Sequence, residues 1–198
     1  MKNVFEVELK AHVNDRENVI KILNDKARYL CFRHKEDVYY TLFKKDGTNI
    51  GVRIRTETIK KNGDQSEERT FTYKRKEIKK DFDRKSIEVN DENEISLSKE
   101  DAQVLEKLFL DIGEIRLKKT KIAENWELNT KAGLANIELC TVPPLGDFLE
   151  IEILTEDDSP AHIEEINNEI KKVFTICEIN LSMIEDHFYS EMLKSMVK

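Results

Sequence analysis

Apolar and polar residues alternate with a period of two along most of this chain, and the polar positions are mainly charged. In VFEVELK, three apolar residues alternate with two glutamates and a lysine, and the pattern recurs in GVRIRTE, TFTYKRK, DRKSIEV, NIELC and FLEIEIL. Because successive side chains of a strand point to opposite faces, each segment would have an apolar face and an ionic face. A solvated face explains any one of them. Their repetition favours a sheet whose ionic faces line a common interior.

Helical spacing of apolar residues is confined to four segments. They are predicted at about 14–26, from Ser98 onwards, after Ser159-Pro160, and at about 187–196. Ser98 and Ser159 have the character of N-caps, and Pro160 suits a first helical turn. The stretches 60–68 and 90–94 are expected to be surface loops. Strands outnumber helices and do not alternate regularly with them, so an α+β antiparallel fold is favoured over a doubly wound parallel one.

Composition excludes several classes of protein. The 33 Lys and Arg against 40 Asp and Glu give a net charge of −7, which disfavours non-specific binding of nucleic acid. The N-terminal segment lacks the apolar core of a signal peptide, and no apolar run approaches the length of a membrane span. The three cysteines form no C-x-x-C pair, so neither a disulfide framework nor a thiolate zinc site is indicated. A cytoplasmic protein with no membrane or nucleic-acid partner is therefore expected.

The charges on the expected strands suit a polyanion bound together with a metal ion. Glutamates two positions apart, as in Glu6/Glu8 and Glu150/Glu152, lie on one face and can hold a hard divalent cation through oxygen ligands. Arginine and lysine neutralise phosphate oxygens, and arginine can do so with two parallel hydrogen bonds. The combination is typical of sites for phosphoryl-transfer chemistry.

Several motifs, in order along nearly the whole chain, resemble the CYTH superfamily of triphosphate tunnel metalloenzymes. Glu6-x-Glu8-x-Lys10 resembles the family's ExExK motif, and Leu145–Glu152 closely resembles its L-G-x-F-x-E-x-E strand. Between them lie segments that resemble its Asp-x-Tyr-aromatic, R-x-R, T-Y-K, R-x-E-x-E and K-x-R strands; these are 36–40, 52–55, 72–74, 84–88 and 119–121.

The resemblance implies one CYTH-like domain over residues 1–198, built as a closed eight-stranded antiparallel β-barrel with helices outside. It implies Mg²⁺ or Mn²⁺ as cofactor, held by Glu6, Glu8, Glu150 and Glu152. The triphosphate would be bound by Lys10, Arg53, Arg55, Lys74, Arg84, Lys119 and Lys121, with Arg116 and Lys118 as alternatives to the last two. Catalysis is assigned to Glu8, Lys10, Glu138 and Glu152. The helices would shield apolar strand faces through Val19, Leu23, Leu105, Leu108, Ile166 and Ile170.

Three positions depart from the family's pattern. Cys140 stands where an aspartate is usual, and a thiol does not replace a carboxylate toward a hard metal ion. Glu138, on the same strand face, is expected to substitute in part. Lys121 replaces an arginine and loses its bidentate geometry. Ser86 replaces a glutamate. These departures predict weakened or altered catalysis.

The resulting functional hypothesis is a metal-dependent enzyme acting on a triphosphate, most similar to class IV adenylyl cyclases. Such an enzyme converts ATP to cyclic AMP and pyrophosphate. A triphosphatase acting on thiamine triphosphate or tripolyphosphate is the alternative, and a non-catalytic nucleotide- or polyphosphate-binding module comes third. A homodimer is compatible with each. The four histidines, Cys31, Cys177 and Trp126 are expected to have structural roles only.

Overall fold

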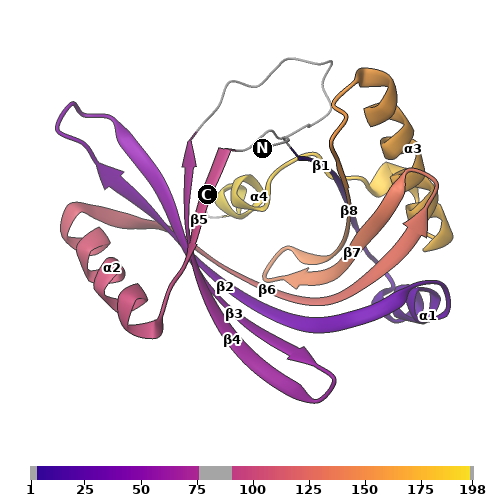
Figure 1. Ribbon diagram of the computed structural model, residues 1–198, viewed down its shortest axis with the longest axis horizontal. Helices are drawn as coiled ribbons and strands as arrows, with labels where there is room; N and C mark the ends of the chain where they lie inside the picture. The colour runs from indigo at the N-terminus through magenta and orange to yellow at the C-terminus, as the bar shows by residue number, and fades with distance from the viewer. Residues whose placement is uncertain (1–3, 76–90, 197–198) are drawn as a thin grey trace. The chain divides into compact units, whose positions relative to one another are not determined.

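A computed structural model of the chain describes residues 4–75 and 91–196. It contains eight strands, four α-helices and one short 3-10 helix among these residues (Figure 1). The elements are β1 (Phe5–His12), α1 (Arg16–Lys26), β2 (Arg28–Phe43), β3 (Asn49–Lys61), β4 (Asp64–Arg75), β5 (Asp91–Ser96), α2 (Lys99–Ile112), β6 (Gly113–Thr130), β7 (Gly133–Val142), β8 (Gly146–Thr155), α3 (Pro160–Ile176), η1 (Leu181–Met183) and α4 (Tyr189–Ser195).

The strands form one eight-stranded sheet in the order β1-β8-β7-β6-β2-β3-β4-β5. Pairing is antiparallel between β1 and β8, β7 and β8, β3 and β4, and β4 and β5. The predicted α+β antiparallel class is confirmed. The expected closure into a barrel is not found among residues 4–75 and 91–196, where β1 and β5 are the two ends of the strand order. The strand expected around Arg84 lies outside the described residues.

The chain divides into two compact units. The described residues of the first unit are 4–32 and 123–196, and those of the second are 33–75 and 91–122. The single domain expected over the whole chain remains a prediction.

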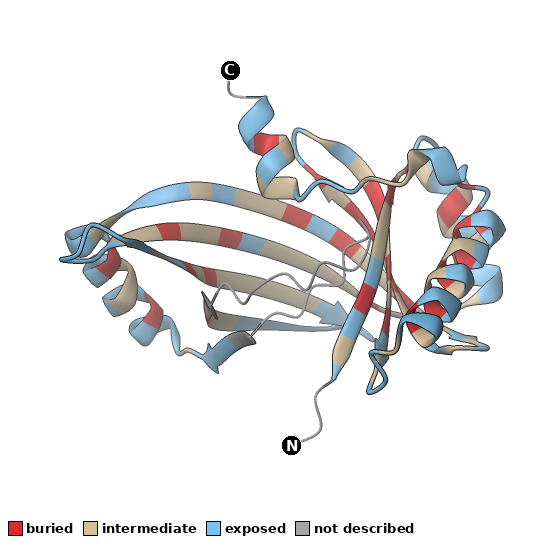
Figure 2. Ribbon diagram, turned by 90° about the horizontal axis from the view of Figure 1, so that it is seen from above, coloured by how far each residue is buried: buried red, intermediate tan, exposed pale blue. Residues whose placement is uncertain are grey.

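The core of the first unit lies between a sheet face and two helices. Leu149, Ile151 and Ile153 of β8 are fully buried, as the alternation predicted. Helix α3 contacts β1 and β8 and buries its apolar stripe, which Figure 2 shows on the side facing the strands. The predicted packing residues Val19, Leu23, Ile166 and Ile170 all belong to this core, together with Trp126.

The second unit has a smaller core in which α2 packs on a sheet face. Val52 and Ile54 of β3 are buried with Tyr40 and Phe109, whose ring centroids are 5.3 Å apart. Leu105 packs against this cluster as expected. The prediction for Leu108 is wrong, because its side chain is 46% exposed. The buried residues of α2 are Ala102 and Phe109. Leu108 points away from the direction of Phe109, because consecutive residues of an α-helix lie about 100° apart around its axis.

Local signals define the element ends. The side chains of Asp15 and Ser98 accept hydrogen bonds from the backbone N–H groups of Asn18 and Asp101, which caps α1 and α2. The loop expected at 60–68 is instead a tight hairpin around Asn62-Gly63, where both residues have positive φ. The prediction of a loop at 90–94 is also wrong, because β5 begins at Asp91 and runs to Ser96.

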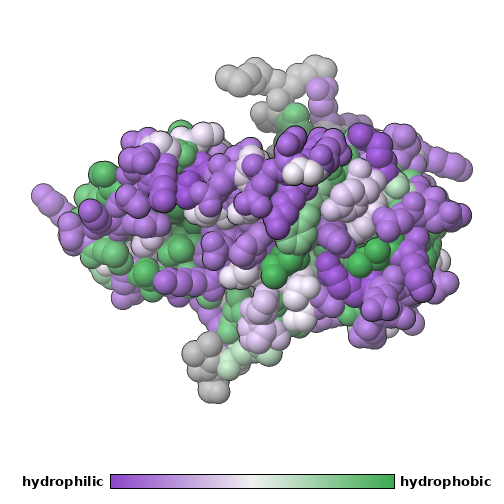
Figure 3. Space-filling view, turned by 90° about the horizontal axis from the view of Figure 1, so that it is seen from below, coloured by the Kyte–Doolittle hydropathy of each residue, from purple (hydrophilic) through white to green (hydrophobic). Residues whose placement is uncertain are grey.

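The helices in the described part of the chain are all too short or too polar to cross a bilayer. On the face shown in Figure 3, hydrophilic residues predominate and apolar residues form separate patches.

Candidate functional site

Pairing of β1, β8 and β7 in the first unit brings the predicted acidic residues into two neighbouring rows. Glu8 lies opposite Glu152, and Glu152 lies opposite Asn136 on β7. One step along the strands, Lys10 lies opposite Glu150, which in turn lies opposite Glu138. Residues directly opposite one another share a face of the sheet. The structure therefore gathers three of the four predicted metal ligands, and it adds Glu138.

The electrostatics of Glu152 reflect this crowding. Its pKa lies above the ordinary value, first because the carboxylate is removed from water and then because Glu8 and Glu138 add negative charge. Hydrogen bonds with Glu6 and Asn136 act in the opposite direction. The fourth predicted ligand, Glu6, therefore also contacts the group. A divalent cation would relieve the repulsion among these carboxylates, and their oxygen atoms are the ligands that Mg²⁺ and Mn²⁺ prefer.

A second group of possible ligands contains the unusual cysteine. The side-chain donor atoms of Glu138, Cys140 and Glu150 all lie within 4.8 Å of one another. Cys140 is fully buried, and its Sγ lies 3.5 Å from the hydroxyl of Tyr189. That hydroxyl donates a hydrogen bond of 2.5 Å to Oε1 of Glu150. The expected placement of Glu138 and Cys140 on one strand face is confirmed.

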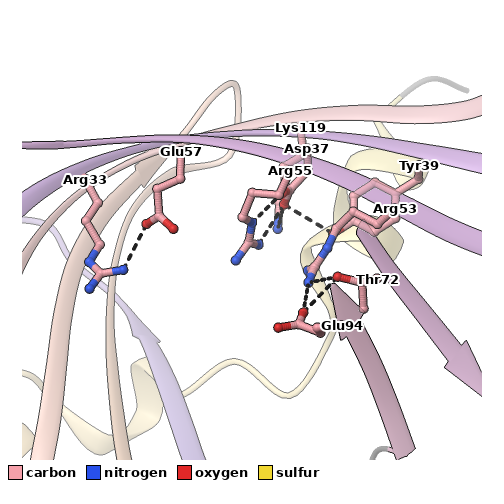
Figure 4. Close-up of polar contacts among 9 residues, drawn as sticks. All are labelled: Arg33, Asp37, Tyr39, Arg53, Arg55, Glu57, Thr72, Glu94 and Lys119. Carbon is pink, nitrogen blue, oxygen red and sulfur yellow. Dashed lines mark hydrogen bonds and ion pairs between the residues drawn. The ribbon is translucent and has the colours of Figure 1, made fainter. Parts of the chain in front are cut away.

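The second unit carries most of the cationic residues that were predicted to bind phosphate, and the Asp37 carboxylate contacts two of them. Arg55 donates from Nε and Nη2 to the two carboxylate oxygens of Asp37, at 2.6 and 3.0 Å (Figure 4). Lys119 Nζ lies 3.1 Å from Oδ2 of the same carboxylate. The Asp37 side chain is completely buried. Burial alone would raise the pKa of Asp37, but Arg55, Lys119 and Arg53 outweigh it and hold that pKa well below its ordinary value.

Arg53 forms a separate cluster beside this pair. Its Nη2 donates to Thr72 Oγ1 at 2.9 Å and to Glu94 Oε1 at 3.1 Å, and Thr72 donates to the same glutamate oxygen at 2.8 Å. The Arg53 side chain is only 12% exposed, and its buried Nε has no hydrogen-bond partner among residues 4–75 and 91–196. A buried guanidinium N–H without an acceptor suits an anionic ligand with several oxygens.

The remaining predicted phosphate ligands are placed as follows. The Lys119 side chain is largely buried and Lys121 is buried, whereas the alternatives Arg116 and Lys118 are exposed. The backbone of Lys74 lies in β4, and its side chain is not described. Arg84 and Ser86 lie outside the described residues.

The residues expected to have structural roles are placed as follows. Cys31 and Cys177 are buried, and burial raises the pKa of the Cys177 thiol to about 12. Trp126 donates from Nε1 to Asn24 at 3.0 Å. His12 and His187 both contact the carboxylate of Glu185.

Two residues of these clusters had no assigned role in the sequence. Asp37 falls within a motif segment, 36–40, but nothing in the pattern showed that it would hold Arg55 and Lys119. Tyr189 follows 39 positions after Glu150 and belongs to no motif. An aspartate or tyrosine of this kind is recognised only once its partners in space are known.

Comparison with known proteins gives a clear result for the fold. No protein-family profile matches the chain, and no curated protein sequence is significantly similar to it. Solved structures do match. The PH1819 protein of Pyrococcus horikoshii is 23% identical, with a TM-score of 0.69 over 96% of this chain and 99% of that one.

Two further structures carry functional descriptions of their own. A candidate adenylate cyclase of Vibrio parahaemolyticus is 16% identical, with a TM-score of 0.65 over 96% of this chain and 98% of that one. A candidate adenylyl cyclase of Hippeastrum, HpAC1, described as having a dominant triphosphatase activity, is 10% identical, with a TM-score of 0.59 over 98% and 96%. The likeness shows that the chain shares the fold of these proteins, and a fold does not by itself determine function.

Proposed function

We propose that this protein is a divalent-metal-dependent enzyme that acts on a triphosphate, as a class IV adenylyl cyclase-like enzyme that converts ATP to cyclic AMP and pyrophosphate. The observation that carries the proposal is the gathering of Glu8, Glu138, Glu150 and Glu152 on three paired strands, with the pKa of Glu152 raised by burial and by its neighbours. Such a group is costly without a cation, so its presence favours metal binding.

In this proposal Glu6, Glu8, Glu150 and Glu152 hold Mg²⁺ or Mn²⁺. The bound ion would supply charge neutralisation on phosphoryl oxygens and a lowered pKa for the attacking hydroxyl. The side chains assigned to phosphate oxygens are Lys10, Arg53, Arg55, Lys74, Arg84, Lys119 and Lys121. Glu8, Lys10, Glu138 and Glu152 are assigned to the reacting centre. Attack of the ribose 3′ hydroxyl on the α-phosphorus would release pyrophosphate and close the cyclic ester.

A triphosphatase is the second candidate. It is supported by the triphosphatase activity that is described for the structurally similar Hippeastrum protein. The same residues would then bind thiamine triphosphate or tripolyphosphate, and water would attack the terminal phosphorus. Cys140 supports a third candidate, a module that binds triphosphates without turnover, because a thiol is a poor ligand for Mg²⁺.

Product analysis separates these candidates. Purified protein would be incubated with ATP, tripolyphosphate or thiamine triphosphate and with Mg²⁺ or Mn²⁺, at neutral and alkaline pH. Cyclic AMP with pyrophosphate identifies the cyclase, and phosphate without cyclic AMP identifies a triphosphatase. Binding without any product supports the non-catalytic module, and recovery of turnover in Cys140→Asp would show that it is a decayed enzyme.

A pair of variants tests the metal site itself. Glu152→Gln removes one carboxylate from the acidic rows and is expected to abolish turnover with the fold intact. Glu164→Gln, at an exposed position of α3, is the matched control and should behave as the wild type. Normal turnover in Glu152→Gln would rule out the assignment of the acidic rows to the metal.

A further inference from the structure

One side chain of helix α4, that of Tyr189, contacts the acidic residues of the first unit. The hydroxyl of Tyr189, at the first position of this helix, donates a 2.5 Å hydrogen bond to Oε1 of Glu150 and lies 3.5 Å from Sγ of Cys140. Lys10 Nζ lies 5.5 Å from the centroid of the Tyr189 ring. One tyrosine thus contacts three residues of the candidate site from an element outside the sheet.

The position of this ring is imposed by packing. It meets the fully buried Phe148 edge-on, with ring centroids 5.0 Å apart and an interplanar angle of 79°. It also packs, together with Met192, against the cluster formed by Ala123, Cys140, Val142 and Phe148. The first turn of α4 is fixed in addition by Glu191, whose carboxylate accepts from the backbone N–H of Phe188 at 3.1 Å. These packing contacts and the hydrogen bond in the first turn of α4 fix the direction of the Tyr189 hydroxyl.

The direction of the hydrogen bond is equally well defined. A tyrosine hydroxyl carries its proton at neutral pH and an ionised carboxylate can only accept, so Tyr189 is the donor to Glu150. A carboxylate with one oxygen held in this way is fixed in its rotation, and it presents its second oxygen in one direction. A hydrogen bond to an ionised acceptor is also among the stronger ones in proteins.

We propose that Tyr189 is a positioning residue for the metal ligand Glu150: its hydroxyl holds one carboxylate oxygen, so that Glu150 binds the ion through the other. This inference rests on the proposed function, because it presupposes that Glu150 binds a divalent cation. Groups that orient metal ligands typically change metal affinity 10- to 100-fold when they are removed, about the range expected here.

The test uses Tyr189→Phe, which keeps the ring contacts with Phe148 and Lys10 and removes only the hydroxyl. Mn²⁺ affinity of the full chain would be measured by electron paramagnetic resonance of the free ion. We expect the dissociation constant to rise about tenfold or more. We also expect kcat to fall while KM for the triphosphate stays unchanged, since Tyr189 is not among the proposed phosphate ligands. Tyr29→Phe, at a half-exposed ring of the same unit, is the matched control.

A double-variant cycle distinguishes positioning from packing. If Tyr189 acts through Glu150, the hydroxyl has nothing to orient in a Glu150→Ala background, and adding Tyr189→Phe should change Mn²⁺ affinity less than twofold further. Equal effects in both backgrounds would overturn the inference, as would an unchanged Mn²⁺ affinity in folded Tyr189→Phe. Absence of Mn²⁺ binding by the wild type would instead overturn the proposed function, and this inference with it.

Discussion

Asp37 is the residue whose replacement should have the largest effect on stability among the charged groups described. Its completely buried carboxylate accepts two hydrogen bonds from Arg55 and lies against Lys119, whose side chains are only 22% and 10% exposed. Asp37→Asn preserves the shape of the side chain but removes its charge. Two largely buried cations would then lack their shared counter-ion.

Removing one partner of a buried ion pair costs about 3–5 kcal/mol, because it leaves a buried charge uncompensated. For a chain of this size, that loss corresponds to a fall in melting temperature of roughly 6–20 °C. The exposed Asp158→Asn is the control and should melt with the wild type. Thermal unfolding followed by circular dichroism at pH 7 measures both.

The pH dependence gives an independent check. Because the pKa of Asp37 is lowered in the folded state, its contribution to the free energy of unfolding is present above the ordinary aspartate pKa of about 3.9. It is lost as the pH falls toward the folded-state value. The difference between wild type and Asp37→Asn should therefore be full at pH 7 and shrink below about pH 4. A variant that melts within a degree of the wild type at pH 7 would refute this account of the cluster.

Three other substitutions test separate parts of the molecule. Phe174→Ala, at a fully buried position of α3, should lower the free energy of unfolding in urea by about 3–5 kcal/mol, and a loss below about 1 kcal/mol would contradict its place in the core. Burial alone would raise the pKa of Glu185, but hydrogen bonds from His187 and His12 lower it to about 2, so the destabilisation caused by Glu185→Gln should fade between about pH 4 and pH 2 in thermal melts. Arg53→Ala should raise KM for the triphosphate with little change in kcat, and an unchanged KM would argue against its phosphate role.

Much of the fold was predictable because its signals are local. The helix after Ser159-Pro160 was expected from a cap, a proline and apolar spacing, and it runs from Pro160 to Ile176. The hairpin at Asn62-Gly63 also carried a local signal, which the many charged residues around it obscured.

Which strands would pair with one another was harder to predict from the sequence. The spacing of Glu150 and Glu152 showed that both share one face, yet it did not show that Glu8 and Glu138 would lie opposite them. Strand pairing depends on contacts between residues distant in sequence, and a period of two is satisfied by many pairings. The resemblance to a family supplied the expected residues, whereas the contacts of Asp37 and Tyr189 became known only from the structure.

The placement of β8 between β1 and β7 has a consequence for changes of length. Its buried Leu149, Ile151 and Ile153 alternate with Glu150 and Glu152. Deleting one residue would send every later side chain to the opposite face, so that carboxylates would enter the core while leucine and isoleucine would line the acidic rows. Insertions and deletions should therefore be tolerated at 131–132 and 143–145, between the strands, and hardly at all within them.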